Sequence, residues 1–219
     1  MDKIKHIVFN GCSFVQGCQD NPEHSKFQDT ARFSKLLVDK LGVQEINLAM
    51  GGSSNDRILR TTYDWILENE DKVSSTLFII GLTQVERTEL LITDKWIRVF
   101  SLSSLTNEDL EHIKNNDISL NDFKAWAKFK MYDSQLKKDI SRKLDLLQTY
   151  IKSKKSNVVF FKTFDEYYIS DKINVWKPNG NTTWAKYISS YDKEYVLTHP
   201  TLVDHKKLFE LLYKDFFNG

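Results

Sequence analysis

The sequence predicts an α/β protein in which helices cover both faces of a parallel sheet. Short apolar runs alternate along the chain with segments whose apolar residues recur every three or four positions. Strands that are buried on both faces read as continuous apolar runs, and the helices between them supply the crossovers. Hydrophobic residues make up 41% and charged residues 28% of the 219 residues, which is typical of a soluble globular domain.

Four segments are predicted to be strands of this sheet. Each is short and rich in β-branched or aromatic residues, and the first three stop at turns that contain glycine. These strands are expected at residues 4–9, 43–48, 76–80 and 157–161. Ligands of parallel α/β sheets bind beyond the carboxyl ends of the strands, so we expect the functional site at the turns that follow them.

Helical spacing of apolar residues marks the segments between the strands. The stripes are clear in three of them, at residues 32–41, 134–153 and 202–217. A fourth helix, with a clear apolar stripe from Ile58 to Leu67, is expected to begin near Ser54 and Asn55, because both are good N-capping residues.

The middle of the chain departs from this alternation. We expect one domain over residues 1–219, with residues 90–133 as an insertion or cap within it. Inside this stretch, residues 95–102 look like a hairpin strand or part of the cap, and residues 107–116 like a short exposed helix. Residues 167–191 are expected to be irregular, since they contain a proline and glycine turn.

Charge and cysteine content exclude several classes of function. The chain has 31 Lys and Arg against 30 Asp and Glu, so it shows neither the basic excess of a nucleic-acid binder nor that of a membrane anchor. Cys12 and Cys18 are too few for a disulfide framework. No apolar run is long enough for a membrane span or a signal peptide, so we expect a cytoplasmic location. No His, Cys and Asp cluster has metal-ligand spacing.

Ser13 follows the first predicted strand in the sequence Asn-Gly-Cys-Ser. A serine at this place can present its hydroxyl at the head of the sheet, where surrounding backbone N–H groups can hold an oxyanion. The motif is not the Gly-x-Ser-x-Gly elbow of the ordinary α/β-hydrolases. The neighbouring Cys12 is interpreted as a small buried packing residue.

Three further motifs follow in order along the chain. They are Asn-Leu-Ala-Met-Gly-Gly-Ser at 47–53, Gly-Leu-Thr-Gln at 81–84, and His-Pro at 199–200. Together with the Ser13 motif they resemble the blocks of the SGNH (GDSL-like) hydrolases, with Cys12 in place of the family's Asp. The Ser13 motif and the Gly-Leu-Thr-Gln motif at 81–84 look most like the divergent branch of this family found in bacteriophages.

The resemblance implies a flavodoxin-like three-layer sandwich and a serine esterase that needs no cofactor. Ser13 would be the nucleophile, and His199, rather than His205, would be the base. The oxyanion would be held by the Ser13 N–H, the Gly52 N–H and Thr83, which stands where the family has Asn. The substrate would be an ester such as an O-acetyl group on a carbohydrate.

The sequence leaves the acid of the triad open. The family places an Asp three residues before the base, where this chain has Val196, which cannot accept a hydrogen bond. Asp192 is chosen because it shares a loop with His199. Glu194, Asp204, Asp165, a backbone carbonyl or water are the alternatives, since an imidazole can also be oriented by these groups at some loss of rate.

Asn55 and Arg87 are candidate substrate contacts near the proposed site. Two other functions remain open. One is a non-catalytic module of the same fold that binds a glycan or a protein. The other is a phosphate or nucleotide binder that uses the Gly11–Gly17 loop at a helix N-terminus and gives His199 no role. The sequence does not define the oligomeric state.

Overall fold

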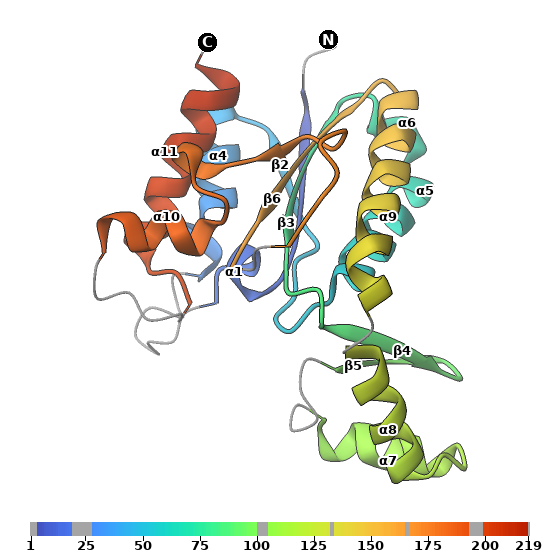
Figure 1. The fold of residues 1–219 in the computed structure, drawn as a ribbon. Helices are drawn as coiled ribbons and strands as arrows, with labels where there is room; N and C mark the ends of the chain where they lie inside the picture. Colours follow the sequence, from blue (N-terminus) through green and yellow to red (C-terminus); the bar gives the residue numbers. More distant parts are fainter. Residues whose placement is uncertain are drawn as a thin grey trace.

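The computed structural model describes residues 4–18, 28–99, 105–131, 134–164, 167–192 and 199–218. At its centre lies a five-stranded parallel sheet with helices on both faces (Figure 1). The strand order across the sheet is β2 (Gln44–Asn47), β1 (His6–Asn10), β3 (Thr76–Leu82), β6 (Asn157–Lys162) and β7 (Val175–Trp176). The predicted flavodoxin-like three-layer sandwich is therefore confirmed.

Strand β1 is an interior strand of this sheet, between β2 and β3, and its last residue lies at the carboxyl edge. It pairs in parallel with β2 and β3, and its last residue, Asn10, is level with Ile80 of β3. Strand β3 in turn pairs with β6. Because these strands all run in one direction, the turns that follow them meet at a single edge of the sheet.

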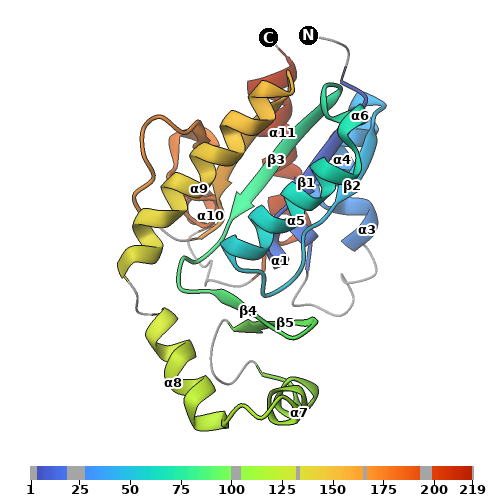
Figure 2. The same ribbon diagram turned by 90° about the vertical axis from the view of Figure 1, so that its right-hand side faces the viewer.

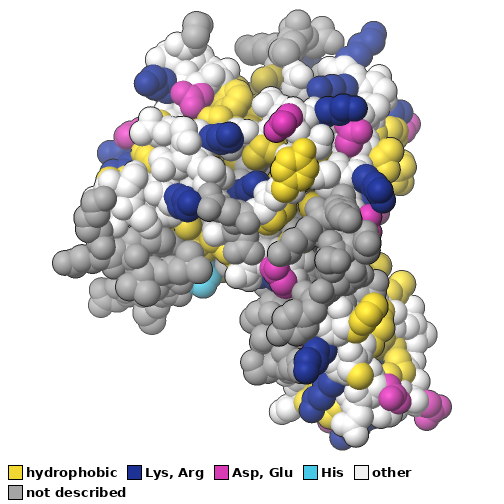
Figure 3. All heavy atoms as spheres, viewed as in Figure 1, with side chains coloured by type: hydrophobic (Ala, Val, Ile, Leu, Met, Phe, Trp, Pro, Cys, Tyr) yellow, Lys and Arg dark blue, Asp and Glu magenta, His cyan; other side chains and the backbone are white. Residues whose placement is uncertain are grey.

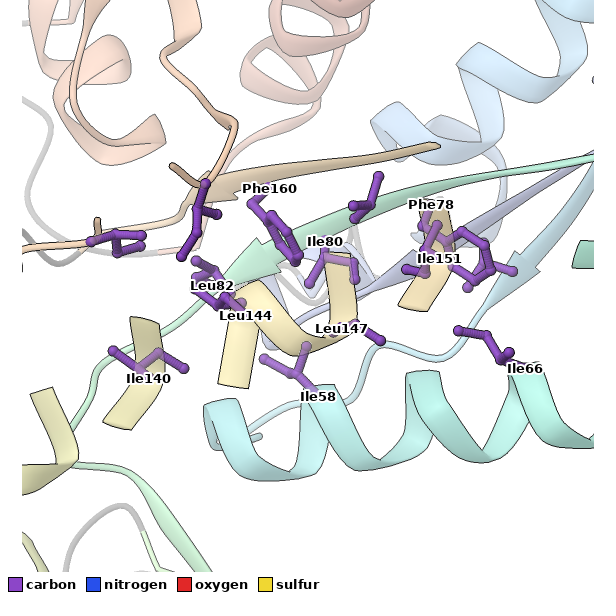
Figure 4. Close-up of a cluster of buried hydrophobic side chains, with 14 of the residues drawn as sticks. Ile58, Ile66, Phe78, Ile80, Leu82, Ile140, Leu144, Leu147, Ile151 and Phe160 are labelled. Atoms are coloured by element: carbon purple, nitrogen blue, oxygen red, sulfur yellow. The ribbon is translucent and has the colours of Figure 1, made fainter. Parts of the chain in front are cut away.

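One face of the sheet is covered by α5 (Asn55–Glu68), α6 (Glu70–Val73) and α9 (Ser134–Ser153). Helix α5 begins where expected, because the side chain of Ser54 accepts a hydrogen bond from the Arg57 N–H. Figure 4 shows aliphatic side chains of α5 and α9 meeting the apolar side chains of the strands. The labelled members of this cluster are Ile58, Ile66, Phe78, Ile80, Leu82, Ile140, Leu144, Leu147, Ile151 and Phe160.

The other face carries α1 (Ser13–Gln16), α4 (Phe33–Leu41), α10 (Trp184–Tyr191) and α11 (Leu202–Phe217), with α3 (Gln28–Ala31) preceding α4. Its core is aromatic: Trp184 is fully buried and its ring meets those of Phe33 and Phe161 edge-on. Such edge-to-face contacts contribute beyond the buried area alone.

Beyond the carboxyl edge of the sheet lies a small lobe, residues 88–131, which we call the hairpin lobe (Figures 1 and 2). It consists of the antiparallel strands β4 (Thr88–Ile92) and β5 (Lys95–Val99), followed by α7 (Asn107–Asn115) and α8 (Leu120–Met131). The lobe has its own apolar cluster, formed by Ile92, Ile97, Val99, Ile113, Phe123 and Ala127. That residues 90–133 are an insertion within a single domain stays a prediction.

An arginine of α5 ties the hairpin lobe to the sheet-bearing part of the molecule. Arg60 donates through Nε and Nη2 to the carboxylate of Glu89, at 2.9 and 3.2 Å, and the Glu89 side chain is almost fully buried. The same guanidinium lies 4.1 Å from the ring centroid of Trp96. A bidentate pair with a stacked aromatic ring fixes both the distance and the orientation of the two parts.

The expectation that residues 167–191 are irregular was wrong for their second half. Helix α10 begins after Thr183, whose side chain accepts from the Lys186 N–H, and it buries Trp184 and Ile188 against the core. The proline and glycine turn before it is a short 3₁₀ segment, Pro178–Gly180. Among the described helices, none combines the length and apolar character needed to cross a bilayer.

Candidate active site

Ser13 owes its position to the tight packing of α1 against the ends of β1 and β3. It is the first residue of α1, and Val15 of the same helix is fully buried. A Cβ atom on Gly11 or on Gly81 would lie only 2.4 Å from Val15 Cγ2. These two glycines therefore leave room for α1, which begins at Ser13, three positions after the last residue of β1.

We expect Gly81→Ala to lower the free energy of unfolding by about 1–3 kcal/mol, because an added methyl group overpacks this site. The new Cβ would overlap Val15 and would lie 3.0 Å from Phe161 Cζ. Denaturant unfolding measures the effect, and the double variant Val15→Ala/Gly81→Ala provides the control. If Gly81→Ala costs as much in the Val15→Ala background as in the wild-type protein, this packing explanation is wrong.

Cys12, the N-cap of α1, belongs to the apolar core on this face of the sheet. Its side chain is fully buried and its Sγ lies 3.8 Å from Thr163 Oγ1. The interpretation of Cys12 as a packing residue is confirmed.

A cavity of about 620 Å³ opens between the carboxyl edge of the sheet and the hairpin lobe. In the space-filling view the outline of the molecule narrows where the two parts meet (Figure 3). The described residues that line the cavity are Ser13, Cys18, Gly51, Gly52, Arg87, Lys95, Trp96, Arg98, Thr106, Glu108, Asp109 and His199. Four sequence-predicted residues, Ser13, Gly52, Arg87 and His199, thus share one cavity, although they are far apart along the chain.

Two residues that line this cavity have backbone N–H groups with no acceptor among the described residues. Ser13 is the first residue of α1, so its N–H has no partner within the helix. In the part of the chain that the structure describes, the Gly52 N–H also donates to no acceptor. Gly52 has φ of 72°, a conformation that favours glycine, and Gly51 beside it lies against Ser13: a Cβ on Gly51 would be 3.8 Å from Ser13 Cβ.

Thr83 and Asn55 are not among the described residues that line this cavity. Thr83 is fully buried, and the amide of Asn55 bonds to its backbone, accepting from Thr83 N at 2.9 Å and donating to Thr83 O at 3.0 Å. The Asn55 amide thereby fastens the start of α5 to the end of β3. The proposed oxyanion role of Thr83 and the substrate contact of Asn55 stay predictions.

The acid of the triad also stays a prediction. Asp192 is an exposed residue at the end of α10 and is not among the described lining residues. Glu194, Val196 and Asp165 lie outside the described residues. Within the described segments, no group of three or more His, Cys, Asp or Glu residues could hold a metal ion.

A further carboxylate near His199 in sequence, Asp204, has a structural role. It caps α11 by accepting from the N–H and the Oγ1 of Thr201, both at 2.7 Å, and it also accepts from the Tyr191 hydroxyl at 2.6 Å. Burial and this hydrogen bond raise the pKa of Tyr191. Because its oxygens accept these three hydrogen bonds, Asp204 acts as a cap that stabilises the start of α11.

His205 is a core residue, in keeping with the choice of His199 as the base. Its ring stacks on Phe33 at 6.0 Å between centroids, and its Nδ1 accepts from the Phe33 N–H at 3.3 Å. Burial lowers its pKa from 6.5 to about 3, so the ring is neutral at ordinary pH.

The buried His205 should make the protein less stable as the pH falls below about 6.5. Between pH 6.5 and about 3 the unfolded chain protonates this imidazole while the folded chain does not, so the free energy of unfolding declines. These two pKa values give a loss of about 2 kcal/mol between pH 7 and pH 5. Urea unfolding at both pH values tests this, and His205→Gln should show a loss smaller by that amount. Equal losses in both proteins would contradict the assignment.

Sequence reasoning missed Arg98 and Gln16, which reach the same glycine turn from two sides. Arg98 Nη1 donates to the Gly51 carbonyl at 2.7 Å, and the Gly51 N–H donates to Gln16 Oε1 at 2.6 Å. The only sequence signal for Arg98 was the alternation in β5, where Ile97 and Val99 are buried. No local pattern marks Gln16.

Comparison with known proteins agrees with this fold. The model of a family of unknown function (DUF6071) matches residues 13–183. A member of the lipolytic G-D-S-L family from Veillonella parvula superimposes with a TM-score of 0.53 at 11% identity, over 97% of this chain and 98% of that one. The crystal structure of TesA gives a TM-score of 0.52 at 9% identity, over 98% and 99% of the two chains. At such identities the likeness shows a shared fold. None of the curated proteins matches the chain in sequence.

Proposed function

The chain belongs to DUF6071, a family of unknown function, and we propose that it is a serine ester hydrolase of the SGNH type. One observation carries the proposal. Ser13 and His199 are 186 positions apart in the sequence, and both line one cavity together with Gly52. A hydroxyl, an imidazole and free backbone N–H groups around one cavity are the components of nucleophilic acyl transfer.

In the proposed reaction, Ser13 Oγ attacks the ester carbonyl carbon while His199 accepts the hydroxyl proton. The negative charge that develops on the carbonyl oxygen is held by the N–H groups of Ser13 and Gly52. Loss of one such donor typically costs about 3 kcal/mol of transition-state stabilisation. The tetrahedral intermediate collapses, and the alcohol leaves with the proton from His199. Water, activated by the same imidazole, then hydrolyses the acyl-enzyme.

For the substrate we propose an ester on a carbohydrate, such as an O-acetyl group. Support comes from Trp96, which lines the cavity, is 39% exposed, and has the guanidinium of Arg60 stacked on its ring. An indole held in place in this way offers a platform for a sugar ring. Arg87, which also lines the cavity, is the proposed polar contact. The likeness to the bacteriophage branch rests on the sequence motifs alone.

For the orienting group of His199 we propose Asp192 or a backbone carbonyl of residues 193–198. Either would fix the imidazole tautomer that accepts the serine proton. A carbonyl recovers less of the rate than a carboxylate does, so the enzyme is expected to be slow on generic esters.

A glycan- or protein-binding module without catalysis is the second candidate. What favours it is Val196 at the position of the family's acid, together with Thr83, which is buried outside the cavity. In that case the same cavity would bind an acetylated glycan and leave its ester intact.

Hydrolysis assays separate the two candidates. The wild-type protein is incubated with p-nitrophenyl acetate and with an acetylated oligosaccharide, and acetate release and binding are both measured. Acetate release supports the hydrolase. Saturable binding of the oligosaccharide without acetate release supports the binding module.

A further inference from the structure

The peptide bond between Gly51 and Gly52 is held through its carbonyl by a residue of the hairpin lobe. Arg98 Nη1 donates to the Gly51 carbonyl at 2.7 Å, across a separation of 47 residues. On the other side of Gly51, the N–H donates to Gln16 Oε1 of α1 at 2.6 Å. The glycine turn is therefore clamped between the helix that carries Ser13 and strand β5.

The carbonyl that Arg98 binds and the N–H of Gly52 belong to one planar trans peptide unit, in which the two groups point in opposite directions. The direction of the Gly51 carbonyl therefore determines that of the Gly52 N–H. A glycine on each side leaves this unit few steric barriers to rotation. The hydrogen bond from Arg98 is thus the contact that selects one orientation of the N–H.

The charge of Arg98 strengthens this contact. Among the described residues Arg98 has no carboxylate partner, whereas Lys95 on the same strand pairs with Glu108 at 2.7 Å and Asp109 at 3.2 Å. A charged donor makes a stronger hydrogen bond than a neutral one, and it polarises the peptide so that the opposite N–H becomes a better donor.

The alternation of side chains in β5 places Arg98 on the side of the strand that lines the cavity. In β5 the side chains of Ile97 and Val99 are buried in the core of the lobe, and those of Trp96 and Arg98 alternate with them and line the cavity. The lobe is in turn fixed to α5 by Arg60. The position of the Arg98 backbone is thereby set independently of the glycine turn.

We propose that Arg98 is a positioning residue, which orients the Gly51–Gly52 peptide so that its N–H faces the cavity beside Ser13. This inference rests on the proposed hydrolase function, in which that N–H holds the oxyanion. Arg98 acts through the peptide and touches no reacting atom. The hairpin lobe then has a role in catalysis as well as in enclosing the cavity.

The sequence permits a direct test, because Gly51–Gly52 is its only Gly–Gly pair. Protein made by cell-free synthesis with glycine labelled at the carbonyl carbon (¹³C) and at nitrogen (¹⁵N) gives a single carbonyl-to-amide NMR correlation, from this peptide. We expect Arg98→Met to move that signal upfield in ¹³C, and Arg98→Lys to move it less. Arg142→Met, at an exposed arginine paired with Asp139, should leave it in place.

A second control separates the hydrogen bond from general loosening of the lobe. Arg60→Met breaks the ion pair with Glu89 and so loosens the lobe, but Arg98 can still donate to the Gly51 carbonyl, so we expect a smaller displacement than in Arg98→Met. An unmoved signal in Arg98→Met, or an equal displacement in Arg60→Met, overturns the proposal. This readout does not depend on activity, so a wild-type protein that hydrolyses no ester would refute the hydrolase while the signal still decides the role of Arg98.

In the kinetic arm, Arg98→Met should lower kcat for an acetate ester by about 10- to 100-fold, part of the loss seen when an oxyanion donor is removed outright. KM should change little, and Arg98→Lys should recover part of the rate. A raised KM with unchanged kcat would show that Arg98 binds the substrate itself, which overturns the positioning role.

Discussion

Replacing Ser13 with alanine should reduce hydrolysis of a short-chain p-nitrophenyl ester to background, a loss of at least about 10⁴-fold in turnover. The variant lacks the oxygen that would attack the carbonyl carbon, and no other group in the proposed mechanism supplies one. Ser13 is half-buried and begins a four-residue helix, so the loss of one hydroxyl should leave Tm within a few degrees. Initial rates and a thermal melt provide the two measurements.

Cys12→Ala is the matched control for this prediction. The neighbouring thiol is fully buried and faces Thr163, so its removal should leave turnover close to that of the wild type. An active Ser13→Ala variant together with an inactive Cys12→Ala variant would transfer the nucleophile to the thiol.

His199→Ala should have the second-largest effect, a loss of about 10³- to 10⁴-fold in turnover, because a catalytic unit is nearly as impaired without its base as without its nucleophile. The measurement is kcat for the same acetate ester. His6→Ala is the control, since His6 is the first residue of β1 and so lies at the amino end of the strand, away from the carboxyl edge where the cavity lies. Wild-type turnover in His199→Ala would mean that another group deprotonates Ser13.

Much of the fold could be predicted from the sequence, because its strongest patterns coincide with burial on both faces of the sheet. The bounds of α9 and α11 were predicted without error, since their apolar residues recur regularly over 20 and 16 residues. Helix α10 was missed because its eight residues follow a turn and are mostly aromatic or small. Strand β4 and helix α8 were also missed. They pack only against the small apolar cluster of the hairpin lobe, so their apolar residues form no long periodic pattern in the sequence.

For the site, the rule that ligands bind at the carboxyl edge was enough to group Ser13 and Gly52, whereas His199 came from the resemblance to the SGNH hydrolases. The same rule predicted a place there for Thr83, but it could not show that Asn55 would bond to the backbone of Thr83. Nor could it find Arg98, because the role of that residue depends on a contact between two segments 47 residues apart. Contacts of this kind follow from tertiary packing, which local patterns do not encode.

The central claim is that Ser13 is a nucleophile activated in the cavity it shares with His199 and Gly52. A fluorophosphonate probe tests it most directly, because it reacts with activated serines and mimics the tetrahedral intermediate. Intact mass and peptide mapping then locate the adduct. The account predicts one adduct on Ser13 in the wild-type protein, none in Ser13→Ala, and much slower labelling in His199→Ala. A wild-type protein that remains unlabelled at Ser13, or carries the adduct on another residue, would contradict it.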